Sequence, residues 1–240
     1  MSFLKSFLNI ISPQECIVCG DLLYSNEKYI CTNCLEDLPL TYYWTWEENP
    51  AEKKLWGRTY FERVIPLFFF EKENNYKKIP YSLKYKNDIK VGIYFGQILG
   101  QHILSAKYGD KKLGDEIDLI VPIPLHKKKQ KKRGYNQSEM IAKGINSILN
   151  KRICPKLIER KKNTETQTGI DMEHKWDNVK DAFEVNKKEM MKIERKYNKP
   201  IHILLVDDVL TTGATSVACA EELLKIKNIK VSLSTLCYVE

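Results

Sequence analysis

Residues 201–215 place an apolar run directly before two adjacent acids and a small, hydroxyl-rich turn. The run is of strand type, Asp207 and Asp208 end it, and a helical pattern starts at about Ser216. The start of a helix offers backbone N–H groups and the positive end of the helix dipole. Carboxylates accept hydrogen bonds from sugar hydroxyls. The order therefore predicts a sugar-phosphate site at the mouth of a parallel sheet. The alternative is an ordinary strand, turn and helix with an acidic strand end.

This stretch resembles the phosphoribosyl pyrophosphate (PRPP) signature of type I phosphoribosyltransferases. The resemblance implies that Asp207 and Asp208 contact the ribose 2′ and 3′ hydroxyls. It also implies that the following loop binds the 5′-phosphate through Thr211, Thr212, Gly213, Ala214 and Thr215.

Composition indicates a folded protein with a basic surface. Hydrophobic residues make up 43% and charged residues 29% of the 240 residues, with a formal net charge of +8. Such a positive excess favours polyanions, such as nucleic acid, or small phosphorylated substrates. We expect no bilayer-spanning segment and no cleaved signal peptide, which predicts a cytoplasmic protein that is peripheral at most to the membrane.

The first eleven residues are apolar on one helical face, which carries Phe3, Leu4, Phe7, Leu8 and Ile11. This spacing predicts a short amphipathic helix docked on the protein. A weak contact with a membrane or a partner is the alternative.

Four of the seven cysteines form two Cys-x-x-Cys pairs, Cys16 with Cys19 and Cys31 with Cys34. Four thiolates at such spacing predict a closed, structural Zn²⁺ site. A disulfide pair would be expected after a secretion signal, and a redox dithiol in a thioredoxin-like context. The sequence shows neither. We expect the other cysteines to be packing residues.

Strand and helix patterns alternate from Arg63 onward. Strands are expected at 64–70, 119–121, 203–206 and 231–238, and helices at 76–86, 90–107, 137–149 and 216–226. The alternation predicts an α/β fold with a mainly parallel sheet and helices on both faces. We expect a small, zinc-ribbon-like N-terminal module over 1–45, with a short helix at 35–38, and a second domain over 46–240. Residues 41–60 should be a connector packed on that domain, and the polar 160–200 region a mobile loop.

A basic run follows the strand at 119–121. Pro122 and Pro124 stiffen the turn, and Gly134, Asn136 and Gln137 precede a helix, so we expect this segment to help Arg133 bind pyrophosphate. The lysines of the run are candidates for nucleic-acid contacts: Lys127, Lys128, Lys129, Lys131 and Lys132. An ordinary solvated surface is the alternative. A third segment contributes Arg160 and Lys161 as candidate catalytic cations.

Together these segments resemble the ComF family of competence-associated, phosphoribosyltransferase-like proteins. The matching pieces span nearly the whole chain: the N-terminus and first Cys-x-x-Cys, Leu83-Lys84-Tyr85, 121–125, 133–137, Thr164 with Gln167, Asn178, and 206–215. One departure is at 172–176, where the family tends to carry arginines. Lys175 cannot supply the bidentate fork of an arginine.

The resemblance implies a type I phosphoribosyltransferase fold with an N-terminal zinc-binding module and a role in the uptake of transforming DNA. It implies PRPP with Mg²⁺ as ligand, and competence-machinery proteins as partners. It leaves open whether the chain is an active phosphoribosyltransferase of nucleotide or nucleoside metabolism, a PRPP-sensing regulator, or a single-stranded-DNA-binding module. In the last case Trp44 and Trp46 could offer stacking surfaces. Interdomain packing of these tryptophans is the favoured alternative.

Overall fold

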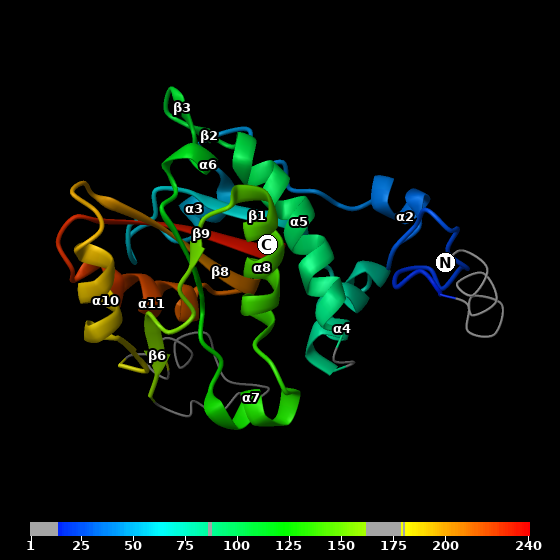
Figure 1. Cartoon of the computed structure of the whole chain (residues 1–240). Helices are drawn as coiled ribbons and strands as arrows, with labels where there is room; N and C mark the ends of the chain where they lie inside the picture. Colours follow the sequence, from blue (N-terminus) through cyan, green and yellow to red (C-terminus); the bar gives the residue numbers. More distant parts are fainter. Residues whose placement is uncertain (1–13, 86–87, 162–178, 180) are drawn as a thin grey trace.

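The protein is a three-layer α/β structure in a computed structural model that describes residues 14–85, 88–161, 179 and 181–240. Its central sheet has five strands in the order β1-β9-β8-β4-β5, and every neighbouring pair is parallel. Figure 1 shows α5 and α8 side by side on one face of the sheet and α10 and α11 on the other. The α/β fold with a parallel sheet is therefore confirmed.

The sheet strands are β1 (Val64–Phe69), β4 (Leu119–Pro122), β5 (Arg152–Ile153), β8 (Ile201–Leu210) and β9 (Ile229–Tyr238). The covering helices are α3 (Pro50–Lys53), α4 (Lys78–Tyr85), α5 (Ile89–Ser105), α8 (Gln137–Leu149), α10 (Lys187–Glu194) and α11 (Ala214–Leu224). Smaller elements are α2 (Thr32–Glu36), η1 (Asn75–Lys77), β2 (Lys107–Tyr108), β3 (Lys111–Lys112), α6 (Leu113–Glu116), α7 (Lys127–Arg133), β6 (Ile158–Arg160) and β7 (Phe183–Val185).

Two apolar cores form because successive side chains of a strand point to opposite faces. In β8, Leu204 and Val206 pack with α5 and α8, while Ile203 and Leu205 pack with α10 and α11. All four side chains are fully buried. Burial on both faces explains why this strand reads as a continuous apolar run.

Two expectations are corrected, and one helix was not predicted. The strand does not end at the acid pair, because β8 continues to Leu210 through its pairing with β9. Residues 127–133, for which no element was predicted, form a helix, α7. Within the described part of 160–200, β7 and α10 are regular elements, and β7 pairs with β6.

The N-terminal segment joins the main sheet through residues 39–41. The Thr41 N–H donates to the Leu67 carbonyl at 3.0 Å, and the Phe69 N–H donates to the Pro39 carbonyl at 2.8 Å. The following connector is fixed by Arg63, which is 1% exposed and forms a 2.7 Å ion pair with Glu52 of α3. The chain thus contacts the sheet from residue 39 onward.

No helix among the described residues is long and apolar enough to cross a membrane. The expected amphipathic helix at 1–11 lies outside the described residues, as do Thr164, Gln167, Lys175 and Asn178.

Candidate functional site

The acid pair lies just beyond the point where the pairing of β8 with β4 ends. The last partners in that pairing are Pro122 and Val206, so Asp207 is the first residue of β8 beyond the carboxyl end of β4. The Ile123 N–H still donates to the Val206 carbonyl at 2.9 Å. The structure thus brings together the acid pair and the Pro122 turn at the carboxyl edge of the sheet, where ligands of such sheets bind.

The two carboxylates have different partners. Asp207 Oδ1 accepts hydrogen bonds from Ser138 Oγ at 3.0 Å and from the Asp208 N–H at 2.9 Å. Asp208 Oδ2 forms an ion pair with Lys84 Nζ at 2.8 Å. Burial, and then the negative charge of Asp208, raises the pKa of Asp207 to about 7. Asp207 therefore holds a proton more readily than an exposed aspartate does.

Lys84 is a site residue that the sequence analysis matched to a family motif without giving it a role. It lies near the end of α4, and its side chain is only 27% exposed. Burial lowers the pKa of Lys84, but the charges of Asp208 and Asp207 outweigh this effect and the pKa is raised. The lysine therefore remains charged beside the acid pair. The available sequence signal was the family match at Leu83-Lys84-Tyr85.

The segment 133–137 joins the site elements. Asn136 caps α8, because its side chain accepts from the Ser138 N–H at 3.2 Å and donates to the Ile123 carbonyl at 2.9 Å. Gln137 donates to the Leu83 carbonyl at 3.2 Å and accepts from Arg133 at 3.1 Å. Gly134 ends α7 in the left-handed region, with φ of 79°. These side chains hold β4, α4 and α8 in place around Asp207.

The loop after β8 turns at Gly213, whose φ is 80°, a conformation that favours glycine. A Cβ there would also clash with Leu55. The Ala214 N–H donates to Thr212 Oγ1 at 3.4 Å, and α11 begins at Ala214, two residues earlier than expected. Thr211 is exposed, whereas Thr212 and Thr215 are partly exposed. Hydroxyls and the first N–H groups of α11 thus gather in the turn that follows β8, a few residues after the acid pair.

The basic helix α7 has two faces. Lys127, Lys128, Lys131 and Lys132 are exposed, whereas Lys129 and Arg133, one helical turn apart, are half-buried. Burial, and then the positive charges of Arg160, Arg133 and Lys84, lowers the pKa of Lys129. The inner face of α7 is therefore electrostatically coupled to the site.

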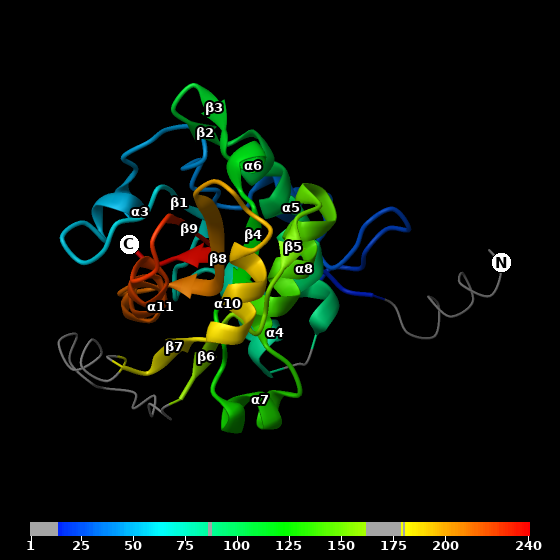
Figure 2. The ribbon, with the colours of Figure 1, turned by 60° about the vertical axis from the view of Figure 1, so that its left-hand side comes forward.

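The two candidate catalytic cations lie on or beside β6. The Arg160 guanidinium lies 5.2 Å from the centre of the Phe183 ring. Burial lowers the pKa of Arg160, and the negative charge of Asp207 opposes this effect. Lys161 forms an ion pair with Glu184 of β7. Figure 2 shows β6, β7 and α7 gathered at one end of the molecule.

The four paired cysteines converge. Their sulfur atoms all lie within 4.8 Å of one another, and Cys19 Sγ is 3.8 Å from Cys31 Sγ. A tetrahedral zinc–thiolate site with bonds of about 2.3 Å would have sulfur separations of about 3.8 Å. The Cys31 N–H donates to Cys16 Sγ at 3.4 Å. This cluster, here called the four-cysteine unit (residues 14–36), could hold a metal ion.

The tryptophans have different environments. Trp44 is buried, and its ring stacks on His102 with 3.8 Å between centroids. Trp46 is 53% exposed. Trp44 is thus a packing residue, as the favoured alternative predicted, whereas the exposure of Trp46 does not match that alternative.

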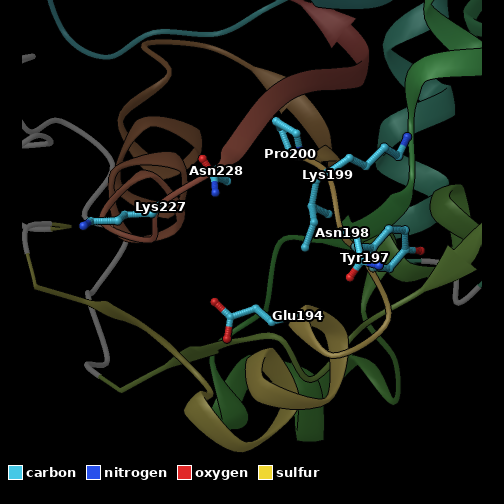
Figure 3. Close-up of a pocket in the computed structure, with 8 residues that line it drawn as sticks. Glu194, Tyr197, Asn198, Lys199, Pro200, Lys227 and Asn228 are labelled. Carbon is cyan, nitrogen blue, oxygen red and sulfur yellow. The ribbon is translucent and has the colours of Figure 1, made fainter.

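A separate hollow of about 370 Å³ lies at the opposite, amino edge of the sheet. Figure 3 shows Glu194 facing it from α10, with Lys227 and Asn228 from the turn before β9. The remaining lining residues are Tyr197, Asn198, Lys199, Pro200 and Ile201. This hollow lacks the paired carboxylates and the hydroxyl-rich helix start, so we assign the functional chemistry to the carboxyl edge.

Known proteins resemble this chain. It is 34% identical over 98 residues to Competence protein F of Haemophilus influenzae, a match that covers 41% of this chain and 40% of that protein. It is 23% identical over 223 residues to the DNA utilization protein YhgH of Escherichia coli, which covers 92% and 89% of the two chains. The YhgH protein of Salmonella typhimurium is 27% identical over 158 residues, 65% of this chain and 64% of that protein. No family model matches.

These relatives support the ComF-family assignment. The assignment agrees with the resemblance inferred from the motifs. The chain matches less than half the length of the Haemophilus protein, whereas the Escherichia match is nearly full-length.

Proposed function

We propose that this ComF-type chain binds PRPP at the acid pair and serves a competence or DNA-utilisation process. The observation that carries the proposal is the position of Asp207 and Asp208, at the carboxyl edge of the sheet and a few residues before the glycine turn that starts α11. Paired acids suit a ribose diol, and the start of a helix suits a phosphate. The names of the relatives support the DNA-related role.

In this proposal each group of the ligand has its own partners. The ribose hydroxyls donate to Asp207 and Asp208, and the 5′-phosphate accepts from the 211–215 loop. The pyrophosphate carries the remaining negative charge, which Arg133, Lys129 and Arg160 would offset. Mg²⁺ bound to the pyrophosphate would supply further positive charge.

The direct test replaces both acids by their neutral isosteres. Asp207→Asn with Asp208→Asn should abolish PRPP binding, measured by calorimetry with Mg²⁺ present, because neither side chain would retain its charge. Glu139→Gln is the matched control, since Glu139 is a neighbouring acid of α8 that pairs with Lys143 instead. Unchanged affinity in the double variant would exclude the PRPP assignment.

A transferase is the second candidate function. It is favoured by the raised pKa of Asp207, about 7, because a carboxyl that titrates near neutrality can take up a proton during a reaction. A screen of amine and nucleobase acceptors for pyrophosphate release tests this candidate. Binding of PRPP without release would instead favour a sensor or regulator.

We further propose that single-stranded DNA binds to the exposed face of α7 and that competence-machinery proteins are partners. The exposed lysines at 127, 128, 131 and 132 favour a polyanion. A cytoplasmic location at the inner side of the membrane belongs to the same proposal.

We propose Zn²⁺ as the metal of the four-cysteine unit. The four thiolates, their spacing and the absence of disulfides among the described cysteines all support a structural zinc site. Metal analysis of protein purified without chelator should find about one zinc per chain. Cys16→Ser with Cys34→Ser should lose the metal, and Cys154→Ser is the control. Metal-free wild-type protein would contradict the assignment.

A further inference from the structure

One short helix is in contact with both the four-cysteine unit and the acid pair. At its first end, Tyr76 of η1 donates a hydrogen bond from its hydroxyl to the Cys34 carbonyl at 2.9 Å. Lys78, the first residue of α4, donates from Nζ to the Val18 carbonyl at 2.7 Å. Cys34 belongs to the cysteine cluster, and Val18 lies between Cys16 and Cys19. Both contacts therefore depend on the folded backbone around the cysteines.

At its second end, α4 is tied to the candidate site. The Leu83 carbonyl accepts hydrogen bonds from the Tyr135 hydroxyl and from Gln137 Nε2. The next residue, Lys84, forms the 2.8 Å ion pair with Asp208. Lys84 follows Lys78 by six positions, about 9 Å along a helix. Figure 1 shows α4 between the N-terminal segment and the rest of the molecule.

We propose that Lys84 is a positioning residue of the acid pair and that the four-cysteine unit fixes its position through α4. The inference rests on the proposed PRPP site. Lys84 holds Asp208 in place and balances the charge of the two carboxylates. A four-cysteine unit without its metal would no longer present the Cys34 and Val18 carbonyls, and α4 would be held at one end only. Because coupling between two sites is reciprocal, a ligand at the acids would also strengthen metal retention.

The experiment compares zinc-loaded and zinc-stripped wild-type protein by hydrogen exchange and by calorimetry with PRPP and Mg²⁺. After stripping, amides of 78–85 should exchange faster, while those of 140–149 in α8 stay protected and show that the core is folded. Affinity for PRPP should fall by roughly 5- to 30-fold, which lies within the range typical of coupled sites.

Two sets of variants test whether α4 and Lys84 link the four-cysteine unit to the acid pair. Tyr76→Phe with Lys78→Met removes both docking bonds without touching a thiolate, and should weaken PRPP binding with zinc still bound. Lys77→Met is the matched control, because Lys77 donates to the nearby Lys72 carbonyl instead. In Lys84→Met, stripping zinc should no longer change the PRPP affinity.

The outcomes separate the two proposals. If zinc-loaded wild-type protein does not bind PRPP, the proposed function fails, and the exchange of 78–85 still decides the link through α4. Unchanged exchange of 78–85 after stripping would overturn the inference. An equal effect of zinc on Lys84→Met and wild type would also overturn it, because the metal would then act by another path.

Discussion

Asp207 should make the stability of the protein depend on pH. Its pKa is raised from 3.8 to about 7 by burial and by the charge of Asp208, so between these values the folded state binds a proton that the unfolded state has released. The free energy of unfolding should therefore fall as pH rises through this window. Asp207→Asn should stabilise the protein at pH 8 by on the order of 1–3 kcal/mol, and by much less at pH 4.

Urea unfolding of the wild-type protein and of Asp207→Asn at pH 4, 6 and 8 measures this difference in the free energy of unfolding. Asp208→Asn is the contrasting variant, because it removes the ion-pair partner of Lys84 and should destabilise the protein at pH 8. An equal increase in the free energy of unfolding of Asp207→Asn at pH 4 and pH 8 would contradict this explanation. A stabilising substitution here would also fit a functional site, where activity is retained at a cost in stability.

The helices α5 and α8 approach closely because glycines face each other at their crossing. A Cβ on Gly144 would lie 2.8 Å from the Gly96 Cα and would also clash with the Ile93 carbonyl. These are backbone atoms, which cannot rotate away. Gly144→Ala should therefore destabilise the protein by about 1–3 kcal/mol, in spite of the better helix propensity of alanine.

Thermal unfolding checks this expectation, with Lys143→Ala as the control on the exposed side of the same helix. Because α8 also carries Ser138, which bonds Asp207, the Gly144 variant should weaken PRPP binding as well. A variant as stable as wild type would show that the two helices can separate at little cost.

Local signals predicted some elements better than others. Helix 137–149 was predicted with its observed bounds, because Asn136 caps it and Asn150 ends it in the left-handed region. Helix α7 was missed, because a run of lysines has no apolar period to reveal a helix. The continuation of β8 past the acids was also missed, since it depends on pairing with β9, which is a contact between distant parts of the chain. The family match had marked Lys84, but its ion pair with Asp208 was found only through the fold, because the two residues are far apart in the sequence.

At the scale of the molecule, the positive charges behind the net charge of +8 differ in their exposure to solvent. The sequence predicted five lysines of 127–132 as one nucleic-acid surface, and that assignment stays a prediction. The structure separates Lys129, on the half-buried inner face of α7, from the four exposed lysines. We therefore expect pyrophosphate and DNA to depend on different faces of one helix. The sequence alone could not separate Lys129 from the other lysines, because the two faces exist only once the segment is a helix.

Changing Lys127, Lys128, Lys131 and Lys132 to Gln should weaken single-stranded DNA binding at all sequences about equally. It should also reduce the slope of log affinity against log salt by up to about 3, because each neutralised phosphate releases counterions. PRPP binding should survive in this variant, whereas Lys129→Gln should weaken it. The matched control is the same change at Lys187, Lys188, Lys192 and Lys196, exposed lysines in and just after α10, which lowers the net charge equally. If that control reduces the slope as much as the α7 variant does, DNA binding depends on the net charge of the protein and not on a contact with α7.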